Sequence, residues 1–82
     1  MDDERELNIA ICKYIYINWI LKAKSQREFA SKHEIEESTV RKIKGIALGT
    51  TKIDYNMSLR TLAKICRKEK MTLKQFFENI NK

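Results

Sequence analysis

Residue types that carry out catalysis or hold metal ions are few in this sequence and lie far apart. His33 is the only histidine, and Cys12 and Cys66 stand alone without a C-x-x-C spacing. With 2 glycines in 82 residues, no glycine-rich loop is present to cradle a phosphate. The sequence therefore predicts no enzyme, no metal site and no cofactor. We interpret the cysteines as free thiols of a reducing compartment, and His33 as a structural residue near a helix end.

The remaining candidate chemistry is electrostatic. The chain has 17 Lys and Arg residues against 11 Asp and Glu residues, a net charge of +6. Residues 1–6 hold four acids and one arginine, so the rest of the chain carries +9. A basic body of this kind favours a polyanionic partner, nucleic acid first. The alternative interpretation is that the excess charge only keeps the surface solvated.

Two short helical patterns lie almost end to end in residues 25–44. Their apolar positions, including the break between them, are Phe29, Ala30, Ile35, Val40 and Ile43. The last two are three residues apart and share one helix face. Ser25 with Glu28 fits a capping box, in which the hydroxyl accepts an N–H of the first turn and the carboxylate accepts the N–H of the capping residue. The stretch therefore predicts two helices joined by a short turn.

This stretch resembles the helix-turn-helix of the Cro/repressor-type DNA-binding family, also called XRE or lambda-repressor-like. The family pattern begins with glutamine and has further fixed positions, which here are Gln26, Phe29, Ala30, Ile35, Val40 and Ile43. Ala30 is small where the two helices cross. The family usually has glycine at the ninth place, where the turn is left-handed; Glu34 stands there, at a cost of ~1 kcal/mol or a little more. The resemblance covers residues 25–80.

The resemblance implies that the second helix of the motif enters the major groove while the first spans the DNA backbone. Arg41 is the strongest candidate for recognising a base, because the two neighbouring N–H donors of its guanidinium match the O6 and N7 acceptors of guanine. By position, the base-reading residues are Glu36, Glu37, Ser38, Thr39, Arg41 and Lys42. Phosphate contacts are expected from Lys24, Gln26, Arg27, Lys44, Thr50, Thr51 and Lys52.

Glu36 and Glu37 would face a polyanion in this placement, and two interpretations remain open. One of the acids accepts from cytosine N4 and thereby reads sequence. Alternatively, both acids only stabilise the N-terminus of their helix. We favour the reading role, because Arg41 and Lys42 lie one turn further along and offset the repulsion.

Periodicity and helix-stop residues predict five helices along the chain. Their expected ranges are 7–22, 26–33, 37–44, 58–71 and 72–80. Residues 1–6 are either a charged overhang or the acidic first turn of the first helix. Gly45 is expected to stop the third helix, and residues 46–57 to form a packed loop.

The two closing helices carry their own capping signals. Ser58 is the expected N-cap of the fourth helix, and Thr72 with Gln75 forms a capping box for the fifth. Their apolar faces are expected to consist of Leu59, Leu62, Ala63, Ile65 and Cys66, and of Leu73, Phe76, Phe77 and Ile80. This pair is similar to the closing helices of the family.

The first predicted helix is apolar on two faces. One consists of Leu7, Ile11, Tyr14 and Ile15, and the other of Ile9, Cys12, Tyr16 and Ile20. An amphipathic helix of a small domain needs one apolar stripe, so the second face is a candidate dimer interface unless the domain wraps around both. Length, Lys13 and Asn18 exclude a membrane span. Trp19 replaces the arginine that the family usually has in this helix.

We therefore expect one all-α domain, residues 1–82, with a compact five-helix lambda-repressor-like fold. The function implied is that of a sequence-specific double-stranded DNA-binding regulator, a repressor acting as a homodimer on a two-fold-related operator. The alternative function is that of a protein-interaction module, such as an antitoxin, anti-repressor or assembly subunit. A third and weaker hypothesis is non-specific binding to nucleoid DNA. We expect a cytoplasmic, bacterial or phage nucleoid-associated protein without membrane or small-molecule partners.

Overall fold

The computed structural model describes residues 3–50 and 54–81. Its elements in chain order are α1 (Asp3–Ile15), the π-helical segment η1 (Tyr16–Ile20), α2 (Gln26–His33), α3 (Glu37–Leu48), α4 (Leu59–Lys68) and α5 (Leu73–Ile80). The described residues contain no strand, which confirms the all-α prediction with five α-helices. None of the described helices has the length and apolar character needed to cross a membrane.

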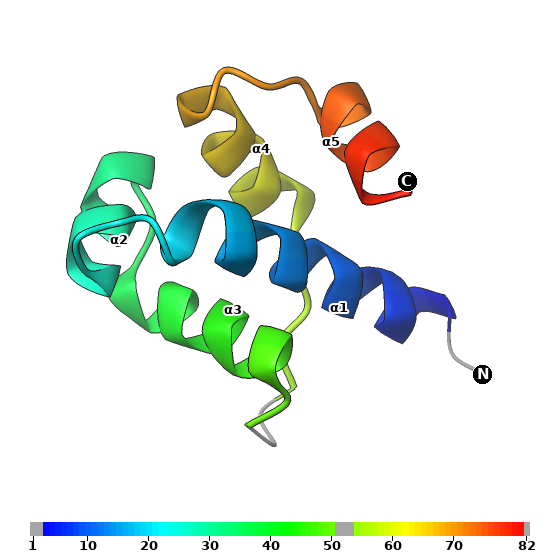
Figure 1. Cartoon of the computed structure of the whole chain (residues 1–82), viewed down its shortest axis with the longest axis horizontal. Coiled ribbons are helices and arrows are strands. Elements are labelled where there is room, and N and C mark those ends of the chain that lie inside the picture. The colour runs from blue at the N-terminus through cyan, green and yellow to red at the C-terminus, as the bar shows by residue number, and fades with distance from the viewer. Residues whose placement is uncertain (1–2, 51–53, 82) are drawn as a thin grey trace.

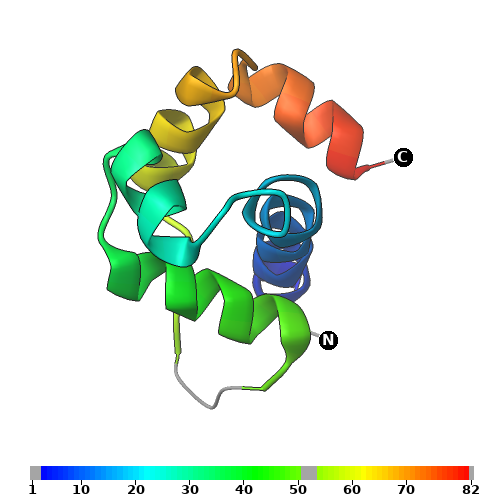
Figure 2. The ribbon, with the colours of Figure 1, turned by 60° about the vertical axis from the view of Figure 1, so that its left-hand side comes forward.

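The helix α1 runs through the middle of the molecule (Figure 1). In Figure 2 the other four helices form an arc around it, in the order α3, α2, α4 and α5. Both predicted apolar faces of α1 are used within the chain: Ile11 and Ile15 from one face and Cys12 from the other are buried. The domain therefore wraps around both faces of its first helix.

The prediction of a dimer interface on the first helix needs correction for two of its four candidate residues. Cys12 and Ile20 belong to the core of the same chain, and Ile9 and Tyr16 are half-buried. A face whose central side chains already fill the core cannot present them to a second subunit. The acidic residues Asp3, Glu4 and Glu6 lie in the first turn of α1. Of the two alternatives for residues 1–6, the acidic first turn of a helix therefore applies to the residues from Asp3 onwards.

The segment η1 continues α1 with a wider turn that periodicity did not predict. The N–H of Leu21 donates to the carbonyl of Tyr16 over 2.9 Å, a bond between residues five apart. Ile15 and Ile20, also five apart, both point into the core. A regular α-helix would place them on different faces, whereas the wider turn brings Ile20 closer to the face of Ile15.

Trp19, which stands where the resemblance predicts an arginine, packs among aromatic rings. Its ring centroid lies 5.4 Å from Tyr14 and 6.0 Å from Phe76. The Tyr14 and Phe76 centroids are 5.0 Å apart in an edge-to-face arrangement. These contacts hold α5 against the end of α1, where the resemblance alone would have suggested a charged residue.

The helices α2 and α3 and the turn between them form the expected helix-turn-helix. Phe29, Ala30, Val40 and Ile43 are buried, and Ile35 is half-buried against them. Ser25 caps α2 by accepting the N–H of Glu28 over 3.0 Å. The capping box is incomplete, because the Glu28 carboxylate accepts the N–H of Lys24 instead of that of Ser25.

The turn after α2 keeps the left-handed conformation without glycine. Glu34 has φ 58° and ψ 42°. Its N–H donates to Ser31, and the N–H of Ile35 donates to Ala30 over 3.0 Å, the paired bonds that characterise a Schellman helix end. Lys70 ends α4 in the same way with φ 58°, which is why α4 stops at Lys68, short of the predicted end at 71.

The predicted end of the third helix is wrong by four residues. Gly45 lies inside α3 and is buried, and the helix continues to Leu48. Gly49, with φ 67°, supplies the left-handed residue, and the N–H of Thr50 donates to the carbonyl of Gly45 over 3.1 Å. The loop expected from residue 46 therefore begins only at Gly49.

Asn8 of α1 holds the segment that leads into α4. Its Nδ2 donates to the carbonyl of Tyr55 over 2.7 Å, and its Oδ1 accepts the N–H of Met57 over 2.8 Å. Tyr55 and Met57 pack against the core, so the described part of the predicted loop is packed as expected. The caps of both closing helices are confirmed, since Ser58 accepts from Thr61 and Thr72 forms the full box with Gln75.

Most of the predicted apolar positions of the closing helices face the core. Leu62, Ile65, Cys66 and Phe76 are buried. Leu59 is an exception, because 67% of its surface is exposed at the start of α4.

Replacing Glu34 by glycine tests the strain in the turn. Glu34→Gly should raise the free energy of unfolding by about 0.5–1 kcal/mol, because glycine adopts the left-handed region without steric cost but loses more entropy on folding. Urea denaturation monitored by circular dichroism measures the change. Ser31→Gly, one turn earlier in a right-handed helix, is the matched control and should lower stability by about 1 kcal/mol. Equal losses in both variants would refute the strain.

Stability should fall in alkaline solution. Burial raises the pKa of the Cys12 thiol to about 12 from 9.0, and burial followed by the nearby Cys12 raises the pKa of Tyr55 to about 12 from 10.0. The unfolded chain ionises first, so this stabilisation is complete below about pH 9 and is lost as the pH rises towards 12. Urea unfolding across this range should show the decline, and Cys12→Ala should flatten it. An unchanged profile in Cys12→Ala would contradict the assignment.

Candidate nucleic-acid interface

A hollow of about 510 Å³ lies between the start of α2, the outer face of α3 and Thr50, the second residue after the end of α3. Its lining consists of Gln26, Ser38, Arg41, Lys42, Lys44, Gly45 and Thr50. We call this surface the α2–α3 hollow. Six of the seven residues are among those predicted from the sequence to contact DNA.

The periodicity of α3 explains how the hollow is built. Val40 and Ile43 anchor the helix in the core, which turns Ser38, Arg41 and Lys42 to the outside. Gly45 follows Arg41 by four residues and therefore lies on the same face. Because glycine has no side chain, the surface of α3 is low at this point and the longer side chains form the rim.

The charge of the hollow is of one sign. Arg41, Lys42 and Lys44 line it, and none of the lining residues is an acid. Within the described residues, neither Lys42 nor Lys44 belongs to an ion pair. Lys42 and Lys44 therefore contribute two positive charges to the hollow that no ion pair within the described residues offsets.

Gln26 occupies the first position of α2, beside the rim. The N–H groups of this first turn point towards its N-terminal end, where the helix dipole favours negative charge. One of these N–H groups, that of Glu28, already donates to the hydroxyl of Ser25. The Gln26 amide thus lies where it could donate to a phosphate oxygen that approaches α3.

The other predicted contact residues lie around the hollow or elsewhere. Lys24 and Arg27 are exposed beside the start of α2, and Thr39 is half-buried and is not part of the lining. Glu36 and Glu37 are exposed at the N-terminus of α3, outside the lining. Thr51 and Lys52 lie outside the described residues.

Gly45 is the residue of the hollow that the sequence analysis missed. The sequence predicts a helix stop at Gly45, although a second glycine follows at Gly49. Its spacing of three residues from Lys42 and four from Arg41 was the available signal, because it places Gly45 on their helix face.

Each acid at the start of α3 contacts a predicted reading residue. The Glu37 Oε1 lies 3.6 Å from Nη1 of Arg41, one turn further along. The Ser38 hydroxyl donates to Oε2 of Glu36 over 3.3 Å. Glu36 is the N-cap residue of α3 but makes no side-chain capping bond to the backbone.

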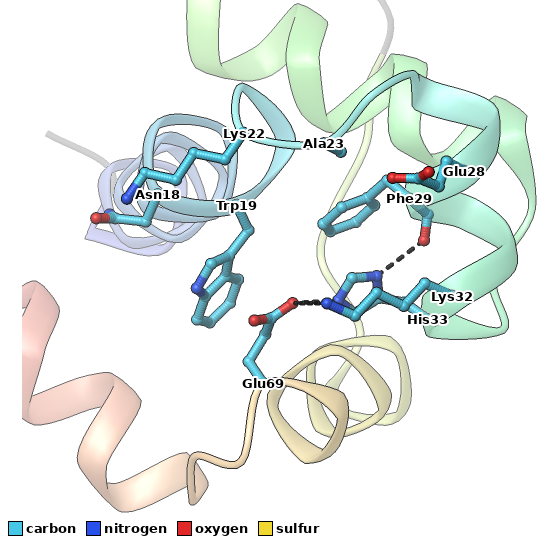
Figure 3. A pocket seen from close by; sticks show the side chains of 9 residues that line it. All are labelled: Asn18, Trp19, Lys22, Ala23, Glu28, Phe29, Lys32, His33 and Glu69. Atoms are coloured by element: carbon cyan, nitrogen blue, oxygen red, sulfur yellow. Dashed lines mark hydrogen bonds and ion pairs between the residues drawn. The ribbon is translucent and has the colours of Figure 1, made fainter.

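A second cavity, of about 210 Å³, lies on the other side of α2 (Figure 3). It is lined by Asn18, Trp19, Lys22, Ala23, Glu28, Phe29, Lys32, His33 and Glu69. Its charges are mixed, with two lysines and two glutamates, so it has no preference for an anion or a cation. Among the described residues, no group of histidines, cysteines and acids is arranged to hold a metal ion.

The buried His33 in this cavity fixes the position of α2. Its Nδ1 donates to the carbonyl of Phe29 over 2.8 Å, and its Nε2 lies 2.5 Å from Oε2 of Glu69 (Figure 3). The ring stacks on Phe29 with centroids 3.9 Å apart. His33 therefore has the structural role predicted for it, although through a carboxylate at the end of α4 and not mainly through the helix dipole.

Comparisons of the chain with known protein families, with curated proteins and with solved structures found no match.

Removing the Glu69 carboxylate should loosen α2. Glu69→Ala leaves Nε2 of His33 buried without a partner, which should lower the free energy of unfolding by about 1–3 kcal/mol. Lys32→Ala is the control, because Lys32 contacts the same carboxylate at 3.6 Å from an exposed position and should cost at most about 1 kcal/mol. Urea titration measures both. A loss in Lys32→Ala as large as that in Glu69→Ala would disprove the central role of the His33 contact.

Proposed function

We propose that the protein is a sequence-specific double-stranded DNA-binding regulator of the Cro/repressor type. The observation that carries the proposal is the α2–α3 hollow, where six predicted contact residues meet on a helix-turn-helix and no acid lines the surface. A helix of this motif fits the major groove, and its outward residues reach base edges.

The roles of the hollow residues follow from their chemistry. Arg41 donates to guanine, since its guanidinium matches two adjacent acceptors. Lys42, Lys44 and the Gln26 amide contact phosphates on either side and set the register of α3 without reading sequence. Ser38 reaches a base edge or a phosphate from the first turn.

We further propose that the protein acts as a homodimeric repressor in the cytoplasm. The resemblance to the Cro/repressor-type family alone supports these three additions. Two-fold-related half-sites about one helical turn apart would then be expected in the operator. The dimer would use a surface other than the Cys12 and Ile20 side of the first helix, because these residues are buried.

A protein-interaction module remains the second candidate, and exposed apolar residues favour it. Ile17 and Leu21 of the η1 region are 57% and 59% exposed, and Leu59 is 67% exposed. Side chains of this size on the surface suit contact with another protein when they gather in one patch. Such a protein would show no preference among DNA sequences.

Selection from a randomised duplex library at about 150 mM salt tests the proposal. The wild-type chain should enrich a two-fold-related motif, and Arg41→Ala should lose the preference for a guanine within it, a change of about tenfold in affinity. Lys13→Ala is the control, because Lys13 is equally positive but lies exposed on α1 outside the hollow. No enrichment by the wild-type chain would reject sequence-specific binding and favour a protein partner.

The same duplexes separate reading from phosphate contacts. Lys44→Ala should weaken binding to all sequences by a similar factor and reduce the slope of log affinity against log salt by about one. A sequence-dependent loss in Lys44→Ala would place this residue among the base readers instead. Fluorescence anisotropy over a range of salt concentrations measures both quantities.

A further inference from the structure

Arg41 lines the α2–α3 hollow, and Glu37, one turn earlier and outside the lining, forms a side-by-side acceptor and donor with it. Their charged atoms are 3.6 Å apart, and both side chains are about half exposed. An exposed ion pair of this kind is weak in water, so both side chains remain able to turn towards a third group. The pair presents a negative oxygen next to a guanidinium that has further unused N–H donors.

A G·C base pair carries the matching pattern in its major groove. Guanine presents the acceptors N7 and O6, and cytosine presents the N4 donor beside O6. O6 and N4 are hydrogen-bonded to each other and lie about 2.9 Å apart. This spacing is close to that of the Glu37 and Arg41 atoms, so the ion pair can stay intact while each partner binds the atom opposite it.

An A·T base pair lacks this three-part pattern. Adenine N6 could donate to the Glu37 carboxylate, and thymine O4 could accept one N–H of Arg41. The second N–H of Arg41 would then meet the thymine methyl group, which lies next to O4 and cannot accept a hydrogen bond. A phosphate is also a poor partner, because it repels the Glu37 carboxylate. Both alternatives leave one member of the pair unsatisfied.

Glu36 is not equivalent to Glu37. Its carboxylate accepts the Ser38 hydroxyl, and its backbone is extended before the helix begins. Among the described residues, its carboxylate forms no ion pair with a lysine or arginine. These contacts therefore assign different roles to Glu36 and Glu37, which the sequence alone does not distinguish.

We propose that Glu37 and Arg41 act as one unit that reads a single G·C base pair, with Arg41 donating to guanine N7 and O6 and Glu37 accepting from cytosine N4. The inference rests on the proposed function, since it assigns the sequence preference of the same hollow. Glu37 thereby becomes a specificity-determining residue, although it lowers the affinity for DNA in general.

Parallel selections with the full chain test the unit. The wild type, Glu37→Gln, Arg41→Ala and the matched control Glu36→Gln are each selected against one randomised duplex library. The enriched wild-type duplex is then varied through all four base pairs at every position, and affinities are measured by fluorescence anisotropy. Circular dichroism checks that each variant is folded, as expected for substitutions at exposed positions.

The preference ratio between duplexes is the decisive quantity. Both Glu→Gln substitutions remove one negative charge and should raise the affinity for every duplex, but only a lost base contact changes the ratio. We expect the wild type to prefer one G·C pair by about tenfold or more, and Glu37→Gln and Arg41→Ala to lose that preference at the same position. Glu36→Gln should keep it.

A base analogue gives an independent readout. Replacing the guanine by 7-deazaguanine removes the N7 acceptor and should weaken the wild type several-fold, while Arg41→Ala should be insensitive to the change. Glu37→Gln could keep the wild-type preference ratio at every position, or could lose the preference at a different position from Arg41→Ala. Either result would overturn the joint recognition of one G·C pair by Glu37 and Arg41 but would leave the proposal of DNA binding intact. If the wild-type chain enriches no duplex, the proposed function fails and the inference falls with it.

Discussion

The burial of the first helix on several sides is the interaction on which the rest of the domain depends. A chain of 82 residues has few apolar side chains to form a core, and Ile11, Cys12 and Ile15 place three of them within one and a half turns of α1. The other helices pack around this centre as Figure 2 shows. The wider turn of η1 extends the buried stripe to Ile20, and Trp19 joins the aromatic rings that hold α5.

The arrangement around α1 leaves the outer face of α3 free. Val40 and Ile43 fix the rotation of that helix, and His33 with Glu69 fixes α2 from the opposite side. The hollow between the two helices is therefore shaped by residues that do not line it. This separation between a rigid support and a polar surface is the usual requirement for a site that must keep its geometry in water.

Local patterns were sufficient to predict much of the fold. The start and end of α2, the start of α3 and the range of α5 follow from caps and apolar spacing, which act within a few residues. The hollow was also predictable in part, because Ser38, Arg41 and Lys42 are spaced to share the outer face of a helix. The resemblance to a known motif placed Gln26 and Thr50 beside them.

The remaining features depend on contacts between distant residues or on close competition between local states. The wider turn of η1 accompanies the burial of Ile20, and no window of sequence reveals it. Gly45 and Gly49 are equally good stops in isolation, and packing of α3 against α1 selects the later one. Cys12 could face a partner or the core until the positions of the other helices are known.

The clamp formed by Asn8 has a consequence for the order in which the chain can fold during synthesis. Asn8 and its partner Tyr55 are 47 residues apart, and the Tyr14 hydroxyl accepts a hydrogen bond from Asn79, 65 residues further on. The first helix is therefore made early but finds its partners late. The contacts of α1 with α3 can form once α3 has been made, but its contacts with α5 can form only when nearly all of the described residues have left the ribosome.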